Sequence, residues 1–414
     1  MPTEYDSGTR YLPVRGVMSS FRFTVASADE AGFSAAVLAE LDCYFDAMVA
    51  SGELPGHVML LARGDQLVRG HVTGYADWDT KSPLRPDSIF PLFSMTKPLT
   101  AVAMLLLYDE GRWQLDDPVS RYLPEFKNIA SLPGSRATRE PTIRETFTHT
   151  AGFSFGKTRE EMLARMQRFA WHKVGSLTEL IGRYANVPLD YEPGTAWEYS
   201  VATDLQAAIV ERLMGERFDL FLQRRLFGPL GMRDTTFSLN YAQTGRLVPT
   251  YVFDAAACRL RRSEDEERME SIVPMGGTSF KSSAHDFALF ARMLLNRGSL
   301  GDVKILEPGT VELMLSNHLP AHLLEGRYTD AHYVIGQGNG HGLNGLVCLD
   351  PVRAGRPVGR GTYEWGGAFG TWFWVDPEND ILCVGMTHRR RVATDMRPLE
   401  VVAQEMVYRA LRRR

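Results

Sequence analysis

The sequence predicts an α/β (α+β) fold in which one lobe carries the strands and a second lobe is mostly helical. Strand-like alternation of apolar and polar residues occurs towards the two ends of the 414-residue chain, and helical spacing dominates its middle. This order differs from a regular β-α-β alternation and is typical of an α/β lobe interrupted by a helical insertion. We therefore expect a discontinuous α/β lobe from residues 1–114 and 299–414, and a mostly helical lobe from residues 115–298.

The first expected elements are a helix and a β-hairpin. Residues 1–30 show no periodic pattern and are expected to form an irregular arm. Ala35–Ala50 repeats apolar residues at spacings of three and four, which predicts a helix. His57–Arg63 and Gln66–Tyr75 alternate like strands, and Gly64-Asp65 between them is a hairpin turn signal.

Helices are expected through most of the segment that follows. The apolar run after Ser94 predicts a helix that ends at Gly111, a residue type common after a helix C-terminus. Prolines and glycines separate the further candidate helices, which are Thr142–Phe147, Arg159–Phe169, Leu177–Tyr184, Ala202–Leu213, Phe218–Leu226 and Ala284–Leu295. After Gly298 the patterns predict a short helix around Val311. They then predict strands at Val347–Asp350, Trp372–Val375 and Ile381–Met386, and a closing helix at Val401–Leu411.

Composition and charge exclude several classes of protein. The net charge of −4 argues against nucleic acid as the main partner. The four cysteines contain no C-x-x-C pair and the ten histidines no H-E-x-x-H pattern, so neither a metal nor another cofactor is expected. No apolar run approaches the roughly 20 residues of a membrane-spanning helix, and no signal-peptide core lies within residues 1–23. We expect a soluble, cytoplasmic protein that acts on a small molecule, and its oligomeric state stays open.

A candidate nucleophile and base lie in Ser94-Met95-Thr96-Lys97. Side chains three residues apart on a helix share one face, so the hydroxyl and the amine lie one turn from each other. A serine is a poor nucleophile until a neighbour accepts its proton, and a lysine can accept it only when an apolar environment keeps it neutral. In the alternative interpretation Ser94 caps a buried helix and Lys97 extends to water. Pro98 disfavours helical backbone geometry at Lys97.

Two later segments contain groups that suit a serine–lysine pair. Tyr199 stands just before the Ala202 helix, and its phenol could relay protons between the serine and a leaving group. The alternative is a half-buried tyrosine with a satisfied hydroxyl. In the segment 363–370, Gly366 and Gly367 would let a ligand approach the backbone, so that a following N–H could join that of Ser94 in an oxyanion hole. The alternative there is a glycine-rich bulge before a core strand.

Four segments in this order carry a resemblance to a known family: Phe93–Pro98, Thr148–Gly152, Pro193–Ser200 and Trp365–Gly367. Together they resemble the superfamily of class C β-lactamases and penicillin-binding proteins, and within it the family VIII carboxylesterases. The resemblance covers residues 35–410. It implies a central, largely antiparallel sheet flanked by helices, with a mostly helical second lobe.

The resemblance also implies roles for the site residues. Ser94 would be the acylated nucleophile, and Lys97 and Tyr199 the proton-transfer pair. The N–H groups of Ser94 and Ala368 would form the oxyanion hole. Trp365-Gly366-Gly367 would bind substrate where the lactamases have Lys-Thr-Gly. Which of Lys97 and Tyr199 is the first base stays open, because the two can titrate as a coupled pair.

Two departures from the lactamase pattern favour esters as substrates. Trp365 replaces a lysine that contacts the substrate carboxylate, and Val201 replaces an asparagine that contacts the amide side chain. Loss of a cation and an amide weakens recognition of a β-lactam. The expected activity is therefore that of a carboxylesterase acting on a small-molecule ester. An acyltransferase with the same acyl-enzyme, an amide, peptide or β-lactam hydrolase, and a non-catalytic penicillin-recognising protein are the open alternatives.

Two other motifs are set aside. Gly152–Gly156 matches the G-x-S-x-G nucleophile elbow, which needs a strand before it, whereas residues 142–148 are expected to be helical. Ser154 is therefore not the expected nucleophile, and His149 is expected to be a structural histidine of that turn. Gly336–Gly342 is rich in glycine but lacks the ending of a P-loop.

Overall fold

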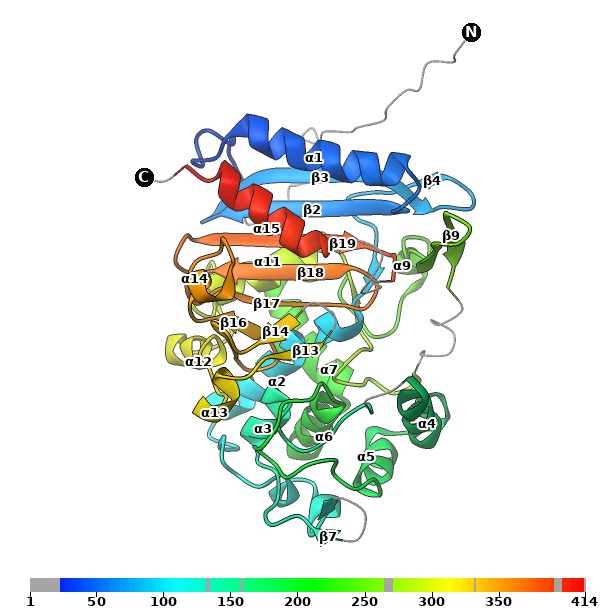
Figure 1. Ribbon diagram of the computed structural model, residues 1–414, viewed down its shortest axis with the longest axis vertical. Helices are drawn as coiled ribbons and strands as arrows, with labels where there is room; N and C mark the ends of the chain where they lie inside the picture. The colour runs from blue at the N-terminus through cyan, green and yellow to red at the C-terminus, as the bar shows by residue number, and fades with distance from the viewer. Residues whose placement is uncertain are drawn as a thin grey trace.

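A mixed sheet with helices on both faces forms the upper part of the computed structural model in Figure 1, and most remaining helices lie below it. The structure describes residues 23–131, 135–156, 159–263, 271–330, 333–390 and 397–412. The nine strands have the order β1-β3-β2-β19-β18-β17-β16-β15, and β4 pairs with β3. Only the short β1–β3 pairing is parallel within this sheet, which confirms the predicted largely antiparallel α+β fold.

The strands of this sheet come from both ends of the chain. They are β1 Thr24–Val25, β2 Gly56–Arg63, β3 Gln66–Asp77, β4 Ser82–Pro83, β15 Asn339–His341, β16 Leu346–Cys348, β17 Tyr363–Gly366, β18 Thr371–Asp376 and β19 Ile381–Thr387. β2 and β19 join the two groups in continuous antiparallel register, from Ile381 opposite Arg63 to Thr387 opposite His57.

Helices from both ends of the chain cover one face of the sheet. α1 (Ala35–Ala50) and α15 (Leu399–Ala410) contact each other and lie over this face in Figure 1. Met59 and Leu61 of β2 belong to the apolar cluster beneath them. Val58 of the same strand points into the second cluster, because successive side chains of a strand face opposite sides.

α11 (Ala284–Leu295) packs against β18, β19 and β2. Its Phe287 and Phe290 contact Phe373 of β18, within the larger apolar cluster. With helices on both faces, all residues of β18 and β19 are buried. α11 lies within the residues expected to form the helical lobe, and yet it packs on the sheet. The expected division into two lobes at residues 114/115 and 298/299 stays a prediction.

α2 (Lys97–Asp109) is a central helix whose residues are buried from Lys97 to Leu107. It follows the 3-10 turn η1 (Phe93–Thr96), so Ser94 lies in η1 and Lys97 is the first residue of the α-helix. Pro98 does not prevent helical geometry at Lys97, whose φ and ψ are −57° and −42°. η1 already holds Lys97, whose N–H donates to Ser94 O, and a proline in the first helical turn loses no hydrogen bond.

Most other predicted elements are confirmed within a few residues. The other helices are α3 Ile143–Thr148, α4 Arg159–Phe169, α5 Leu177–Ala185, α6 Ala202–Met214, α7 Phe218–Leu222, α8 Gly228–Leu230, α9 Tyr241–Thr244, α12 Pro308–Met314, α13 Ala321–Leu324 and α14 Pro351–Ala354. Shorter turns of helix are η2 Val119–Arg121, η3 Pro124–Phe126, η4 Trp171–Lys173 and the π-helical turn η5 Gln223–Phe227. Two-stranded pairs are formed by β5 Phe90–Pro91 with β10 Lys281–Ser282, β6 Ala130–Ser131 with β7 Ser135–Arg136, β8 Tyr251–Asp254 with β9 Arg259–Arg262, β11 Ser299–Leu300 with β12 Val303–Lys304, and β13 Tyr328–Asp330 with β14 Tyr333–Ile335.

The structure differs from the expectations at short elements. The arm expected for residues 1–30 contains β1, which pairs with β3, and its residues 1–22 lie outside the described residues. β15 and β17 were not predicted, because each has only three or four residues and is defined by its partners in the sheet. The expected helix Phe218–Leu226 changes to a π turn after Leu222.

Candidate active site

The structure brings Ser94, Lys97 and Tyr199 together at the start of α2. The phenol of Tyr199 donates a hydrogen bond to Oγ of Ser94 over 2.6 Å. Nζ of Lys97 lies 4.8 Å from the centroid of the Tyr199 ring, and Lys97 is only 2% exposed. A hydroxyl, a phenol and an amine therefore share one partly enclosed site.

The turn η1, which carries Ser94, begins at a residue with a strained backbone. Phe93, the residue before it, has a φ of +47°, which is uncommon for a residue with a bulky side chain. Its ring stacks on that of Phe369 at a centroid distance of 4.7 Å. Thr371 Oγ1 donates to the carbonyl of Leu92 over 3.2 Å. These two contacts fasten the turn that carries Ser94 to the loop between β17 and β18.

The β17–β18 loop is where the expected oxyanion donor lies. A Cβ at Gly367 would lie 2.1 Å from the carbonyl oxygen of Leu92, so only glycine allows this close approach. The Gly367 N–H donates to Thr371 O over 2.7 Å, which closes a tight turn. Ala368 is exposed at the tip of this turn, and its N–H makes no hydrogen bond with another described residue.

Trp365 and Gly366 precede this turn in β17. Gly366 lies opposite Trp372 in the antiparallel register with β18. Trp365 is 1% exposed, and its ring lies 6.0 Å from the Tyr199 ring. The tryptophan thus packs behind the phenol, as part of the wall that holds it. Val201, the other departure from the lactamase pattern, is buried at the N-terminus of α6.

A buried hydrogen-bond chain that was not predicted holds the amino group of Lys97. Nζ of Lys97 donates to the Gly277 carbonyl over 3.0 Å, and the Gly277 N–H donates to Asp204 Oδ1 over 2.8 Å. Asp204 Oδ2 accepts from the phenol of Tyr184 over 2.8 Å, and that phenol accepts from Trp171 Nε1. Burial raises the pKa of Asp204, and it raises the pKa of Tyr184 well above its usual value. An acidic residue within the apolar face of α6 was the only sequence signal for this chain.

A pair of amide side chains supports the backbone of Lys97. Asn344 Nδ2 donates to the Lys97 carbonyl over 2.9 Å and to Gln206 Oε1 over 2.7 Å. Gln206 Nε2 donates back to Asn344 Oδ1 over 3.1 Å. Both side chains are buried, so this reciprocal pair locks α2 to α6 and to the segment before β16.

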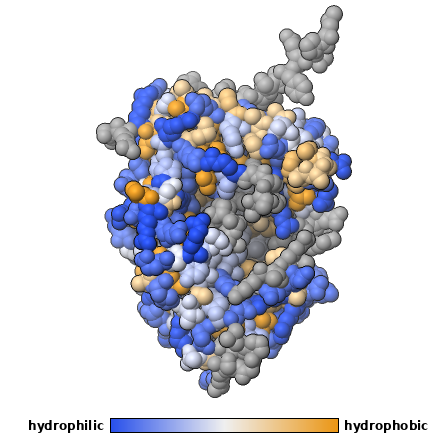
Figure 2. Space-filling view, viewed as in Figure 1, coloured by the Kyte–Doolittle hydropathy of each residue, from blue (hydrophilic) through white to orange (hydrophobic). Residues whose placement is uncertain are grey.

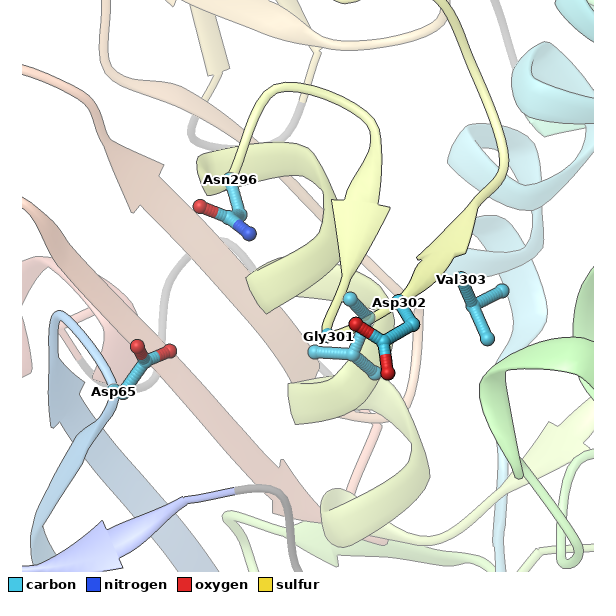
Figure 3. Close-up of a pocket in the computed structure, with 6 residues that line it drawn as sticks. Asp65, Asn296, Gly301, Asp302 and Val303 are labelled. Atoms are coloured by element: carbon cyan, nitrogen blue, oxygen red, sulfur yellow. The ribbon is translucent and has the colours of Figure 1, made fainter.

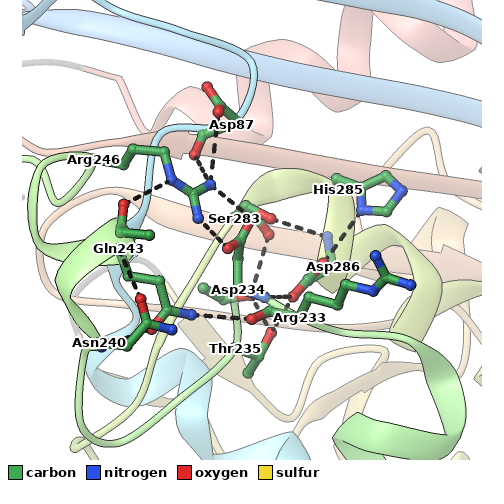
Figure 4. A network of polar contacts seen from close by, with 12 residues as sticks. Asp87, Arg233, Asp234, Thr235, Asn240, Gln243, Arg246, Ser283, His285 and Asp286 are labelled. Atoms are coloured by element: carbon green, nitrogen blue, oxygen red, sulfur yellow. Dashed lines mark hydrogen bonds and ion pairs between the residues drawn. The ribbon is translucent and has the colours of Figure 1, made fainter. Parts of the chain in front are cut away.

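A polar network fixes the chain on its way into η1 (Figure 4). Arg246 Nη1 donates to a carboxylate oxygen of Asp234 over 2.8 Å and to the Asp87 carbonyl over 2.9 Å. The Asp234 N–H donates to Asp286 Oδ2 over 2.6 Å, at the N-terminus of α11. The N–H of Ile89 donates to the Arg246 carbonyl, five residues before Ser94. The network thereby links α11 to the strand that leads into the site.

The segment around Ser154 lacks the geometry of a nucleophile elbow. It follows α3 and not a strand, as expected. Ser154 is 4% exposed, and its Oγ accepts a hydrogen bond from the Gly156 N–H over 2.8 Å. His149 ends α3 with a φ of +58° and is fully buried, which agrees with the structural role expected for it in this turn.

Other surface features do not involve the expected site residues. A hollow beside the β11–β12 hairpin has a volume of about 530 Å³ and is lined by Asp65, Asn296, Leu300, Gly301, Asp302 and Val303. Figure 3 shows these side chains from close by. In the part of the chain that the structure describes, no group of three or more His, Cys, Asp or Glu side chains is arranged to hold a metal ion. Among the same residues, no helix has the length and apolar character needed to cross a membrane. Figure 2 shows hydrophilic residues over most of the visible face, with the hydrophobic ones scattered.

Comparison with known proteins places the chain in a family. Residues 41–405 match the Beta-lactamase family. The chain belongs to that family. The match spans strands from both ends of the chain and all three residues Ser94, Lys97 and Tyr199, and it confirms the predicted superfamily and its fold.

Two curated relatives and a solved structure are similar to this chain over most of their length. Protein Rv1367c of Mycobacterium tuberculosis is 32% identical, with 80% of this chain and 85% of that protein covered. Esterase EstB of Burkholderia gladioli is 30% identical, with 93% and 99% covered. The structure of EstCE1, described as a hydrolase with promiscuous acyltransferase activity, matches with a TM-score of 0.77 at 26% identity and covers 90% of this chain and 99% of that one.

Proposed function

We propose that this chain is a carboxylesterase of the family VIII type, a serine hydrolase that cleaves small-molecule carboxylic esters through an acyl-enzyme on Ser94. The observation that carries the proposal is the 2.6 Å hydrogen bond between the Tyr199 phenol and Oγ of Ser94, beside a buried Lys97. The similarity to EstB and to the EstCE1 structure supports ester chemistry.

In the first step Oγ of Ser94 attacks the ester carbonyl carbon and its proton passes to the Tyr199 oxygen. The phenol must first lose its own proton. A neutral Lys97 Nζ accepts that proton, and the ammonium formed, 4.8 Å from the ring centroid, stabilises the phenolate. The carbonyl electrons move to oxygen, and the N–H groups of Ser94 and Ala368 stabilise that oxyanion.

The oxyanion then collapses, and the bond to the alcohol oxygen breaks. Tyr199 returns its proton to the departing alkoxide, which leaves as an alcohol, and the acyl group stays on Ser94. Water repeats the sequence: it gives a proton to Tyr199, attacks the acyl carbon and releases the acid, and Ser94 recovers its proton from the phenol.

The site favours esters over β-lactams. No cationic residue stands at position 365, and Trp365 packs behind Tyr199, so a substrate carboxylate loses the partner that a lysine would supply. Val201 is likewise buried and cannot donate to an amide carbonyl. Acyl transfer to an alcohol is the second candidate, and the activity stated for EstCE1 favours it.

All four cysteines are free thiols, which supports a reducing, cytoplasmic location.

Burst kinetics and labelling test this function. We expect p-nitrophenyl butyrate to give a burst of p-nitrophenol, and a fluorophosphonate to add mass at Ser94. Ser94→Ala should abolish both, whereas Ser154→Ala should leave both unchanged. Full activity of Ser94→Ala would refute the proposal. Added alcohol separates the two candidates by the ratio of ester to acid formed, and turnover of a chromogenic cephalosporin as fast as ester would indicate an amide hydrolase.

A further inference from the structure

His149 makes hydrogen bonds to both neighbours of Tyr199. The Glu198 N–H donates to the carbonyl of His149 over 3.0 Å. On the other side, Nδ1 of His149 lies 3.2 Å from Oγ of Ser200. One residue of the turn after α3 thus holds the chain immediately before and immediately after the phenol that contacts Ser94.

The imidazole of His149 also packs on the phenol itself. The two ring centroids are 4.7 Å apart, and the planes are inclined by 54°. The imidazole is backed by other buried rings: His341 at 5.5 Å, Trp197 at 6.0 Å and Trp365 at 6.2 Å. His149 and His341 are both 0% exposed, so the rings have no room for another orientation.

The backing ring is itself fixed. Nδ1 of His341 lies 2.7 Å from the Gly342 carbonyl, which requires Nδ1 to carry the proton and to donate. Burial lowers the pKa of His341 to about 4, so this imidazole is neutral near pH 7. His341 therefore adds no positive charge beside Tyr199.

His149 is neutral as well. Burial, and then the neighbouring His341 and Lys97, lower the pKa of His149 well below its usual value. The rings packed around it belong to Tyr199, His341, Trp197 and Trp365, and His341 is neutral near pH 7. Lys97 is the cation that acts on it. A neutral imidazole orients the phenol without adding a second positive charge beside Lys97.

We propose that His149 is a positioning residue for Tyr199, and that its imidazole and its bond to Ser200 keep the phenol within hydrogen-bond distance of Ser94. The inference rests on the proposed function, because it assigns His149 an effect on acylation that acts through the Tyr199 oxygen. A displacement of about 1 Å at a reacting group can lower a rate about 100-fold. The His149 side chain contacts the phenol ring and the residue after it, so its removal has a measurable effect.

A double-mutant cycle between residues 149 and 199 tests the proposal. The acylation rate constant is measured from the p-nitrophenyl butyrate burst in the wild type, His149→Ala, Tyr199→Phe and the double variant. We expect His149→Ala to lower acylation about 100-fold, mainly in kcat, with the affinity for substrate changed less than threefold. In the Tyr199→Phe background the same substitution should change the rate less than twofold, because the phenol oxygen is already absent.

Two further variants separate positioning from general stability. His149→Asn keeps a polar atom that can reach Ser200 and tolerates the left-handed backbone, so it should recover at least tenfold of the lost rate. His57→Ala removes another fully buried histidine, which stacks on Phe45 on the α1 side of the sheet. It should lower the melting temperature and leave acylation unchanged.

Three results would overturn the inference: wild-type acylation in His149→Ala, an equal loss in both backgrounds, or an equal loss in His57→Ala. An unchanged rate in Tyr199→Phe alone would instead refute the proposed function. The two failures are therefore distinguishable within one set of proteins.

Discussion

Tyr199→Phe is the most direct test of the site, because it removes one oxygen and keeps the ring. That oxygen lies 2.6 Å from Oγ of Ser94, and the ring itself is held by His149 and Trp365. A positioned general base contributes roughly 100- to 10,000-fold to a rate, or about 3–5 kcal/mol of transition-state free energy. The lost hydrogen bond should lower the free energy of unfolding by only about 1 kcal/mol. Activity should therefore fall far more than stability.

The measurement is the rate of the p-nitrophenol burst in stopped flow, together with urea unfolding of the same protein. Tyr363→Phe is the matched control: its phenol is fully buried in β17 and donates to the Leu343 carbonyl over 2.8 Å. The control should lose a similar amount of stability and acylate within twofold of the wild type. If Tyr199→Phe acylates within threefold of the wild type, the phenol does not carry the proton and the mechanism is wrong.

The remaining predictions concern the oxyanion loop and acid stability. Gly367→Ala should lower acylation at least tenfold in the burst assay, because its Cβ would lie 2.1 Å from the Leu92 carbonyl and must displace Ala368; a wild-type rate would refute the role of this loop. Burial lowers the pKa of His341 to about 4 and that of His388 to about 3, so the unfolded chain binds more protons than the folded one below about pH 6.5. Stability should therefore fall with falling pH, by about 2 kcal/mol for each of the two histidines between pH 7 and pH 5 in urea titrations, and His388→Leu should reduce that slope. A free energy of unfolding that is equal at both pH values would contradict this account.

Local patterns predicted the long elements of the fold. The spacing of apolar residues over Ala35–Ala50 and Ala284–Leu295 gave the bounds that α1 and α11 have, since an amphipathic helix repeats within a few residues. β1 and β17 were not predicted, because a strand of two to four residues is defined by the strand that it pairs with. The partner of β1 lies far along the chain, and the partner of β17 follows a turn. The Ser94–Lys97 spacing predicted helical geometry at Lys97, and this geometry forms despite Pro98 because the η1 turn precedes it.

The supports of the site could not be found in the same way. Asp204, Gly277 and Tyr184 form one hydrogen-bond chain, yet each has an ordinary local pattern. His149 was interpreted only as part of its own turn, although its bonds reach residues 198 and 200. These contacts depend on how α3, α6 and the loops between them pack.

The sequence by itself determined that a hydroxyl and an amine stand one turn apart at Ser94 and Lys97, because spacing within a helical turn follows from backbone geometry alone. Only the tertiary structure decided that a phenol 105 residues further on meets the serine, and that a carbonyl 180 residues beyond the lysine accepts a hydrogen bond from its Nζ. Chain segments so far apart meet only when the apolar faces of α2, α6 and the sheet are buried together, and that packing is a property of the whole fold.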